Sequence, residues 1–173
     1  MSALFKLQPQ LEVELLAVGR YGDYQNSGFR PLVADYSGAE WTASLAARYV
    51  PWPGLLVEGS VYYYGADARA DYYARSGPGA LLAVSKDLRV GDYRFGATLR
   101  GGLRHLSYNA PDPFIDPTRT RSDTFFNAGA VVTLPLSRDV SAIVQYNYLR
   151  NRSDYAVYSF TDHSVTAGLR LAF

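Results

Sequence analysis

The chain has 173 residues and a formal net charge of +1, which favours a single domain and argues against electrostatic attraction to nucleic acid. It contains no cysteine, so disulfides, thiolate metal sites and cysteine nucleophiles are excluded. Its 15 tyrosines favour β-strands, and no apolar run approaches the ~18 residues of a transmembrane helix.

Most of the chain alternates apolar and polar residues with the period of a β-strand rather than that of a helix. In chain order the alternating segments are 7–13, 41–49, 55–63, 76–86, 93–103, 124–136, 140–148 and 164–173. The segment 76–86 is the weakest, because it is apolar on both faces in places and Pro78 restricts it to a strand start or a sheet edge. The pattern therefore predicts eight strands.

The connections between these segments alternate strictly between long and short. The long ones, at 22–37, 65–75, 107–122 and 151–160, are polar and rich in turn formers, whereas those at 50–54, 88–93 and 137–139 are short. This arrangement is typical of an up-and-down meander with its long loops at one end. We therefore predict one all-β domain over residues 1–173, an eight-stranded antiparallel up-and-down barrel.

Alternation fits two opposite proteins: a soluble lipocalin-like binder with an apolar interior, and an outer-membrane barrel with an apolar exterior. Long strands and aromatic residues at the strand ends favour the membrane. At the short-turn end these aromatics are Tyr49, Trp52, Tyr93, Phe95 and Phe173, and at the long-loop end they are Tyr21, Trp41, Tyr63, Tyr146 and Tyr148. We expect them to form two interface belts of a transmembrane barrel.

The minor face of the predicted strands carries charged residues. They are Glu12, Glu14, Glu58, Arg48, Arg100, Arg104 and Arg170. The interior of an eight-stranded barrel is just wide enough to be filled by side chains, and buried charges persist only when they are paired. We expect these residues to form a polar network in the lumen, with Arg170 turned inward toward Glu12 or Glu14. On a soluble barrel the same residues would be ordinary surface charges.

The last eight residues resemble the C-terminal assembly signal of Gram-negative outer-membrane barrels. Thr166, Gly168, Leu171 and Phe173 fill the polar, glycine, hydrophobic and terminal aromatic positions of that signal. The whole chain looks like a small OmpA/OmpX-type barrel, and residues 146–173 are also similar to the ends of larger barrels, including polysaccharide-export porins. The resemblance implies recognition by the barrel-assembly machinery, an outer-membrane location, periplasmic N- and C-termini, and external long loops.

One pair of residues raises the question of catalysis. His105 and Ser107 have the two-residue spacing of the His–Ser pair in outer-membrane lipid A deacylases. However, Tyr108 stands where that family has Asn, and no Glu follows Glu58, so Asp112 or Asp116 would have to orient the histidine. Both side chains are expected on the lipid-facing side, where they would cap the strand. With only two histidines, we predict no metal site and no cofactor.

These observations lead us to expect a non-enzymatic outer-membrane barrel with a structural or surface-interaction role and a largely side-chain-filled lumen. The alternatives are a narrow porin or a component of an export pore, and a lipid A-modifying enzyme. The expected partners are outer-membrane lipid and lipopolysaccharide, whose phosphates suit the arginines of the long loops. The barrel-assembly machinery, during insertion, and other envelope proteins are further expected partners.

Overall fold

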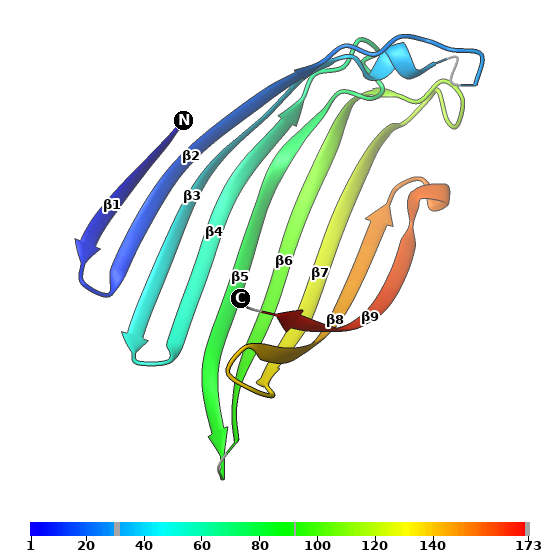
Figure 1. The fold of residues 1–173 in the computed structure, drawn as a ribbon. Helices are drawn as coiled ribbons and strands as arrows, with labels where there is room; N and C mark the ends of the chain where they lie inside the picture. The colour runs from blue at the N-terminus through cyan, green and yellow to red at the C-terminus, as the bar shows by residue number, and fades with distance from the viewer. Residues whose placement is uncertain (30–31, 92, 172–173) are drawn as a thin grey trace.

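The chain folds into one antiparallel sheet whose nine strands lie side by side in chain order (Figure 1). The computed structural model describes residues 1–29, 32–91 and 93–171. The strands are β1 Ser2–Gln8, β2 Leu11–Gly22, β3 Gly38–Trp52, β4 Leu55–Ala66, β5 Arg75–Val90, β6 Tyr93–Pro111, β7 Thr120–Pro135, β8 Val140–Ser153 and β9 Phe160–Leu171. The short 3-10 helices η1, Val33–Tyr36, and η2, Ala156–Tyr158, lie in two of the long loops. Within these ranges, no helix is long and apolar enough to cross a membrane.

The predicted all-β, up-and-down arrangement is confirmed, but the prediction of eight strands is wrong. Residues 7–13 do not form one strand, because a turn at Pro9 and Gln10 divides them between β1 and β2. Proline has a fixed φ and no amide hydrogen, and it is therefore suited to a turn rather than to the middle of a strand. The apolar alternation continues unbroken through the turn, which is why the pattern did not reveal it.

Several strands extend further toward the long-loop end than predicted. The expected loop 107–122 is shorter in the structure, because Ser107 pairs with Ser122 and the two strands continue to Pro111 and from Thr120. At the opposite end, Gly54 and Gly91 occupy tight turns with φ values of 76° and 60°. These are left-handed conformations that glycine adopts without strain.

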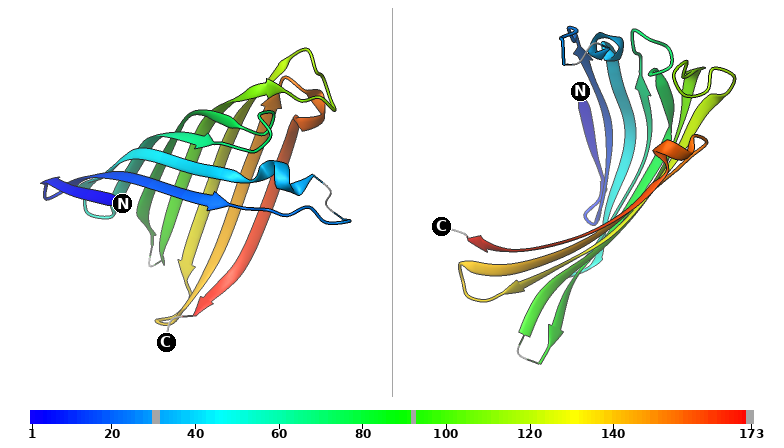
Figure 2. Two further views of the ribbon diagram at one scale, coloured as in Figure 1. Left: turned by 90° about the horizontal axis from the view of Figure 1, so that it is seen from above. Right: turned by 90° about the vertical axis from the view of Figure 1, so that its right-hand side faces the viewer.

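The sheet is strongly curved, and its two edge strands stand apart (Figure 2). β1 pairs only with β2, and β9 pairs only with β8, so the predicted closure is not found among the described residues. Because the strand number is odd, β1 and β9 run in the same direction. Ser2 lies opposite Leu16, so the chain starts beside the middle of β2 rather than at the short-turn end, where β9 finishes.

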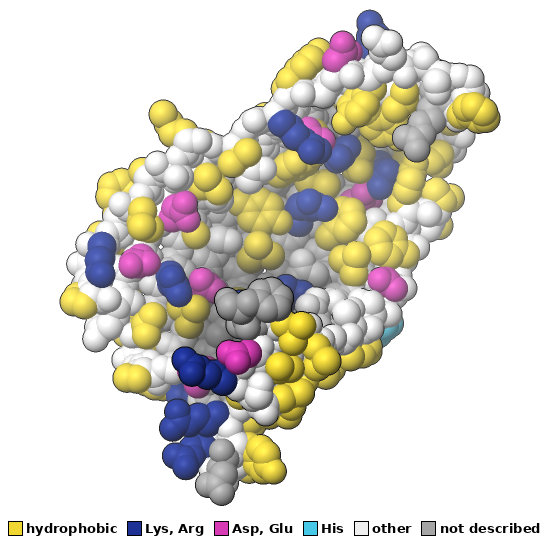
Figure 3. Space-filling view, in the orientation of Figure 1, with side chains coloured by type: hydrophobic (Ala, Val, Ile, Leu, Met, Phe, Trp, Pro, Cys, Tyr) yellow, Lys and Arg dark blue, Asp and Glu magenta, His cyan; other side chains and the backbone are white. Residues whose placement is uncertain are grey.

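The two faces of the sheet differ in chemistry. The concave face, seen in Figure 3, carries the charged residues of the strands around a hollow. The opposite, convex face carries an almost unbroken apolar surface. Its largest exposed members are Leu15, Tyr21, Trp41, Leu45, Tyr49, Val61, Tyr63, Leu82, Tyr93, Leu99, Leu103, Phe126, Val132, Val144, Tyr146, Val165, Leu169 and Leu171. A soluble barrel would place such residues on the inside of the curve.

The packed core lies at the long-loop end rather than in the middle of the sheet. The buried residues other than glycine are Ala34, Ser37, Ala66, Ala74, Leu106, Asp112, Asp123, Asn151 and Tyr155. All of them belong to the long loops or to the strand segments next to them. We call this assembly of the long loops and the adjoining strand ends the cap.

Replacement of Leu106 by alanine tests whether the cap is the stabilising core. Leu106 is 2% exposed, and truncation of a buried leucine leaves a cavity that costs about 2–5 kcal/mol. We expect Leu106→Ala to lower the free energy of unfolding in detergent by that amount in urea titrations. The matched Leu99→Ala variant removes a side chain that is 65% exposed on the convex face, and a loss of equal size there would contradict this assignment.

Candidate functional site

The concave face encloses a hollow of about 840 Å³ that reaches from β1 to β8. All seven residues of the predicted lumen network lie on this face, as the register of the strands requires. Five of them, Glu12, Glu14, Arg48, Glu58 and Arg100, line the hollow itself. The structure therefore places together charges that are far apart in the sequence.

One row of directly opposed residues crosses the six strands β1 to β6 at a single level, and we call it the charge belt. It consists of Lys6, Glu12, Arg48, Glu58 and, beyond Ala83, Arg100. Charges of opposite sign face each other across the first four positions. The Arg48 guanidinium lies 3.8 Å from the Glu58 carboxylate, and the Arg100 guanidinium donates a 2.7 Å hydrogen bond to Asn147 Oδ1. The first four charges of the row alternate in sign, but of these four only Arg48 and Glu58 form an ion pair among the described residues, so the predicted network is present in part.

The prediction that Arg170 lies beside Glu12 or Glu14 is wrong. Arg170 lies on β9 opposite Ser141, and β9 is not a neighbour of β2, which carries Glu12 and Glu14. The physical reason is that β1 already occupies the edge of β2 that a closed eight-stranded barrel would give to β9. None of the ion pairs among the described residues includes Arg170.

Arginines and aromatic rings alternate on the concave face above the charge belt. The Arg104 guanidinium carbon lies 4.7 Å from the ring centroid of Phe125 and 5.9 Å from that of Tyr64. Tyr64 also faces the Arg75 guanidinium at 5.9 Å. Cation–π contacts of this kind hold a guanidinium in place without neutralising it. Arg104 was predicted to be a lumen residue, but nothing in the alternation indicated its aromatic partners.

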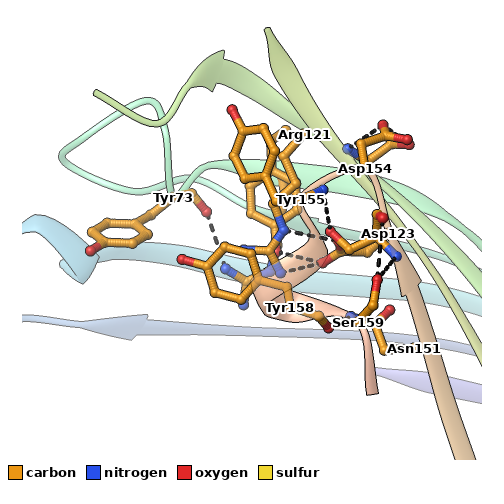
Figure 4. Close-up of polar contacts among 12 residues, drawn as sticks. Tyr73, Arg121, Asp123, Asn151, Asp154, Tyr155, Tyr158 and Ser159 are labelled. Atoms are coloured by element: carbon orange, nitrogen blue, oxygen red, sulfur yellow. Dashed lines mark hydrogen bonds and ion pairs between the residues drawn. The ribbon is translucent and has the colours of Figure 1, made fainter. Parts of the chain in front are cut away.

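The most buried polar side chain among the described residues is that of Asp123, which is 0% exposed. Its carboxylate accepts hydrogen bonds from the Arg121 guanidinium (Figure 4). It also accepts one from the Tyr108 hydroxyl. The guanidinium itself lies 3.5 Å from the centroid of the Tyr158 ring. The ion pair lies within β7 and satisfies the buried carboxylate, and the contact between Arg121 and Tyr158 ties β7 to the loop that contains η2. The sequence analysis missed it, since Arg121 was interpreted as one of the solvated arginines of the loop 107–122 and Asp123 was not considered.

Hydrogen bonds interlock the long loops of the cap. The Tyr155 hydroxyl contacts the Asp116 and Arg119 carbonyl oxygens, and the Asp154 carboxylate accepts hydrogen bonds from Ser122 N and Oγ. The bonds from Ser122 hold the pKa of Asp154 below its usual value. This contact is therefore present above the usual carboxyl pKa and is lost as the pH falls through the lowered one.

The two N-terminal loops are joined in a similar way. The Tyr72 hydroxyl donates a 2.8 Å hydrogen bond to Asp35, and the Tyr36 and Tyr73 rings stack with their centroids 3.8 Å apart. Desolvation, followed by the bond to Asp35, raises the pKa of Tyr72 to about 12. The phenol therefore remains a hydrogen-bond donor at neutral pH. The long loops thus pack against one another and are not four separate solvated loops.

His105 and Ser107 lie on the convex face, at the boundary between the apolar surface and the cap. His105 Nδ1 is 3.0 Å from Thr124 Oγ1. Asp112 accepts a hydrogen bond from Phe114 N, and Asp116 accepts bonds from Thr118. Among the described residues, no carboxylate is hydrogen-bonded to His105, and the arrangement gives no support to a catalytic relay. The described part of the chain also contains no group of three or more His, Cys, Asp or Glu residues that could hold a metal ion.

The remaining predicted residues lie along the strands. Thr166, Gly168 and Leu171 are in β9, while Phe173 falls outside the described residues. At the long-loop end Trp41 stacks on Tyr63 with centroids 5.7 Å apart, and the rings of Phe126, Tyr148 and His163 form a second group. The predicted aromatics at the short-turn end, Tyr49, Trp52 and Tyr93, are exposed.

Comparison of the chain with protein-family models, curated proteins and solved structures finds no match. The functional argument therefore rests on the geometry of the two faces and of the cap.

The Arg121–Asp123 pair provides a test of the cap. Substitution Asp123→Asn leaves the Arg121 guanidinium, whose side chain is 15% exposed, without its carboxylate. Loss of one partner of a buried pair costs about 3–5 kcal/mol. We expect limited proteolysis to cut the loops at 112–119 and 154–159 much faster in this variant.

The control is Arg48→Gln, which breaks an ion pair whose side chains are 56% and 50% exposed. Exposed pairs contribute about 0–1 kcal/mol, so the loops should be cut at the wild-type rate. Equal cleavage of the two variants would show that the buried pair does not hold the cap.

Proposed function

We propose that this chain forms the wall of a transmembrane β-barrel in a bacterial outer membrane and lines a polar passage through it. The convex face would contact lipid and the concave face would contact water. The observation that carries the proposal is the sidedness of the curved sheet, with apolar residues outside the curve and charged residues inside it. A soluble lipocalin-like binder has the opposite arrangement.

The height of the apolar surface supports a membrane location. Trp41 and Tyr49 mark its two limits on the convex face of β3, eight residues apart. At ~3.4 Å per residue this is ~27 Å along the strand, and a strand tilt of ~40° reduces it to ~21 Å. Tyr148 and Val140 are also eight residues apart on β8. These values are close to the apolar band of about 25 Å in outer-membrane barrels.

The concave face supports a passage better than a filled lumen. Eight-stranded barrels are filled by side chains, whereas here the concave face surrounds an open hollow of about 840 Å³. Unpaired strand edges are costly in hydrocarbon, so the free edges of β1 and β9 must find partners in a membrane. We propose that strands beyond these nine complete a barrel wider than eight strands. The mass in detergent tests this point, because a stable monomer would contradict it.

A structural or surface-interaction role is the second candidate, and the cap favours it. Four long loops that lock together into a packed unit would present a rigid surface outside the membrane. The two candidates differ in conductance, since only the passage requires a water-filled lumen.

Fluorescence quenching tests the membrane location. The chain has 2 tryptophans, Trp41 toward the long-loop end and Trp52 at the short-turn end, both exposed. The Trp41→Phe variant retains only Trp52, and the Trp52→Phe variant retains only Trp41. In vesicles, we expect the fluorescence of each remaining tryptophan to be quenched more strongly by lipids brominated near the headgroup than by lipids brominated near the bilayer centre. The reason is that an aromatic belt lies at the interface. Fluorescence that is insensitive to either lipid would contradict insertion.

Planar-bilayer recording tests the passage. We expect a steady conductance, and we expect the double substitution Glu12→Gln with Glu14→Gln to shift the reversal potential in a salt gradient toward anion selectivity. The reason is that these carboxylates line the hollow and neither forms an ion pair with a described residue. An inserted protein that passes no current would rule out the passage and leave the surface role.

A further inference from the structure

A polar collar lies on the convex face between the apolar surface and the cap. It consists of His105 and Ser107 on β6, Ser122 and Thr124 on β7, Arg150 and Arg152 on β8, and Thr161 on β9. The strand register places these side chains on the same face as Tyr148 and Phe126, directly above the aromatic belt. In this collar the only permanent charges are the two arginines.

Both guanidiniums are free to bind a ligand. Arg150 and Arg152 are exposed, and neither takes part in any ion pair, hydrogen bond or cation–π contact found among the described residues. Asp154 follows two residues later on the same side of the strand, but Ser122 N and Oγ hold its carboxylate. By contrast, Arg75, Arg104 and Arg121 lie on the concave face and contact aromatic rings. Arg20, near the cap on β2, forms an ion pair with Glu40.

The height of the two arginines fits a lipid headgroup. Arg150 and Arg152 follow Tyr148 by two and four residues on β8, which is ~7 and ~14 Å along the strand and ~5 and ~10 Å along the normal at a tilt of ~40°. The polar layer on each side of a bilayer is about 5–7 Å thick. With Tyr148 in the belt, Arg150 lies inside that layer, and the backbone of Arg152 lies ~3–5 Å beyond it, a distance that a long arginine side chain spans when it bends back toward the headgroups.

We propose that Arg150 and Arg152 form a binding site for a phosphate-bearing lipid of the outer leaflet, whose acyl chains pack on the apolar surface beside Tyr148 and Phe126. Guanidinium groups bind phosphate through two parallel hydrogen bonds, and the hydroxyl of Thr161, opposite Arg150, adds a third donor. This proposal rests on the proposed function, because it requires the convex face to contact lipid.

The test measures the affinity of the detergent-solubilised protein for lipid A that carries both phosphates, by native mass spectrometry. The double variant Arg150→Gln with Arg152→Gln should bind about tenfold more weakly, since each lost charge-assisted contact is strong. The matched control, Arg94→Gln with Arg138→Gln, removes the same charge from exposed positions at the short-turn end and should bind like the wild type. Dephosphorylated lipid A should bind weakly and equally to all three proteins.

Two results would overturn the proposal: wild-type affinity in the Arg150/Arg152 variant, or displacement of the lipid by inorganic phosphate alone at similar affinity. The second would indicate a site for a free anion. Tryptophan quenching of the same proteins separates this failure from failure of the proposed function. A protein that inserts and lacks the phosphate preference contradicts only the lipid site, whereas a protein that does not insert contradicts both.

Discussion

The whole structure depends on which side of the curve receives the apolar residues. Each strand alternates with a period of two, and neighbouring strands keep one register except at shifts near three hairpin ends. The face of one residue in the middle of the sheet therefore determines the face of the residues in the middle of all nine strands. Here the apolar residues lie outside and the charged residues inside. The sheet therefore leaves the large apolar side chains of its convex face exposed, and the membrane location that we propose would give them an apolar environment.

The position of the core follows from this constraint. With the convex face turned outward and the concave face open, the long-loop end is where side chains from different elements meet and exclude water. The buried Asp123 carboxylate, the Tyr155 hydroxyl and the stacked Tyr36 and Tyr73 rings all lie there. The cap thus replaces a central core, and it joins loops that the strand ladder alone would leave separate. A packed cap above a polar hollow is compatible with both candidate functions.

The sequence predicted the strand type, the meander and the common face of the charged residues, because these follow from local alternation. It did not predict the turn at Pro9 and Gln10, since the alternation passes through it. Nor did it predict the burial of the Arg121–Asp123 pair or the partners of Arg104, because these depend on Tyr108, Tyr158, Phe125 and Tyr64, which other elements supply. The position of Arg170 was predicted from an assumed closure, and closure depends on edge pairing that no local pattern encodes.

The most direct test of the sidedness is a scan of single cysteines along β3, which is possible because the chain contains no cysteine of its own. Spin labels at residues 42–48 report collision with oxygen, which concentrates in lipid, and with a water-soluble nickel complex. In a bilayer, labels at positions 43, 45 and 47 should favour oxygen, and labels at 42, 44, 46 and 48 should favour nickel. The same alternation in opposite phase, or none at all, would contradict the account.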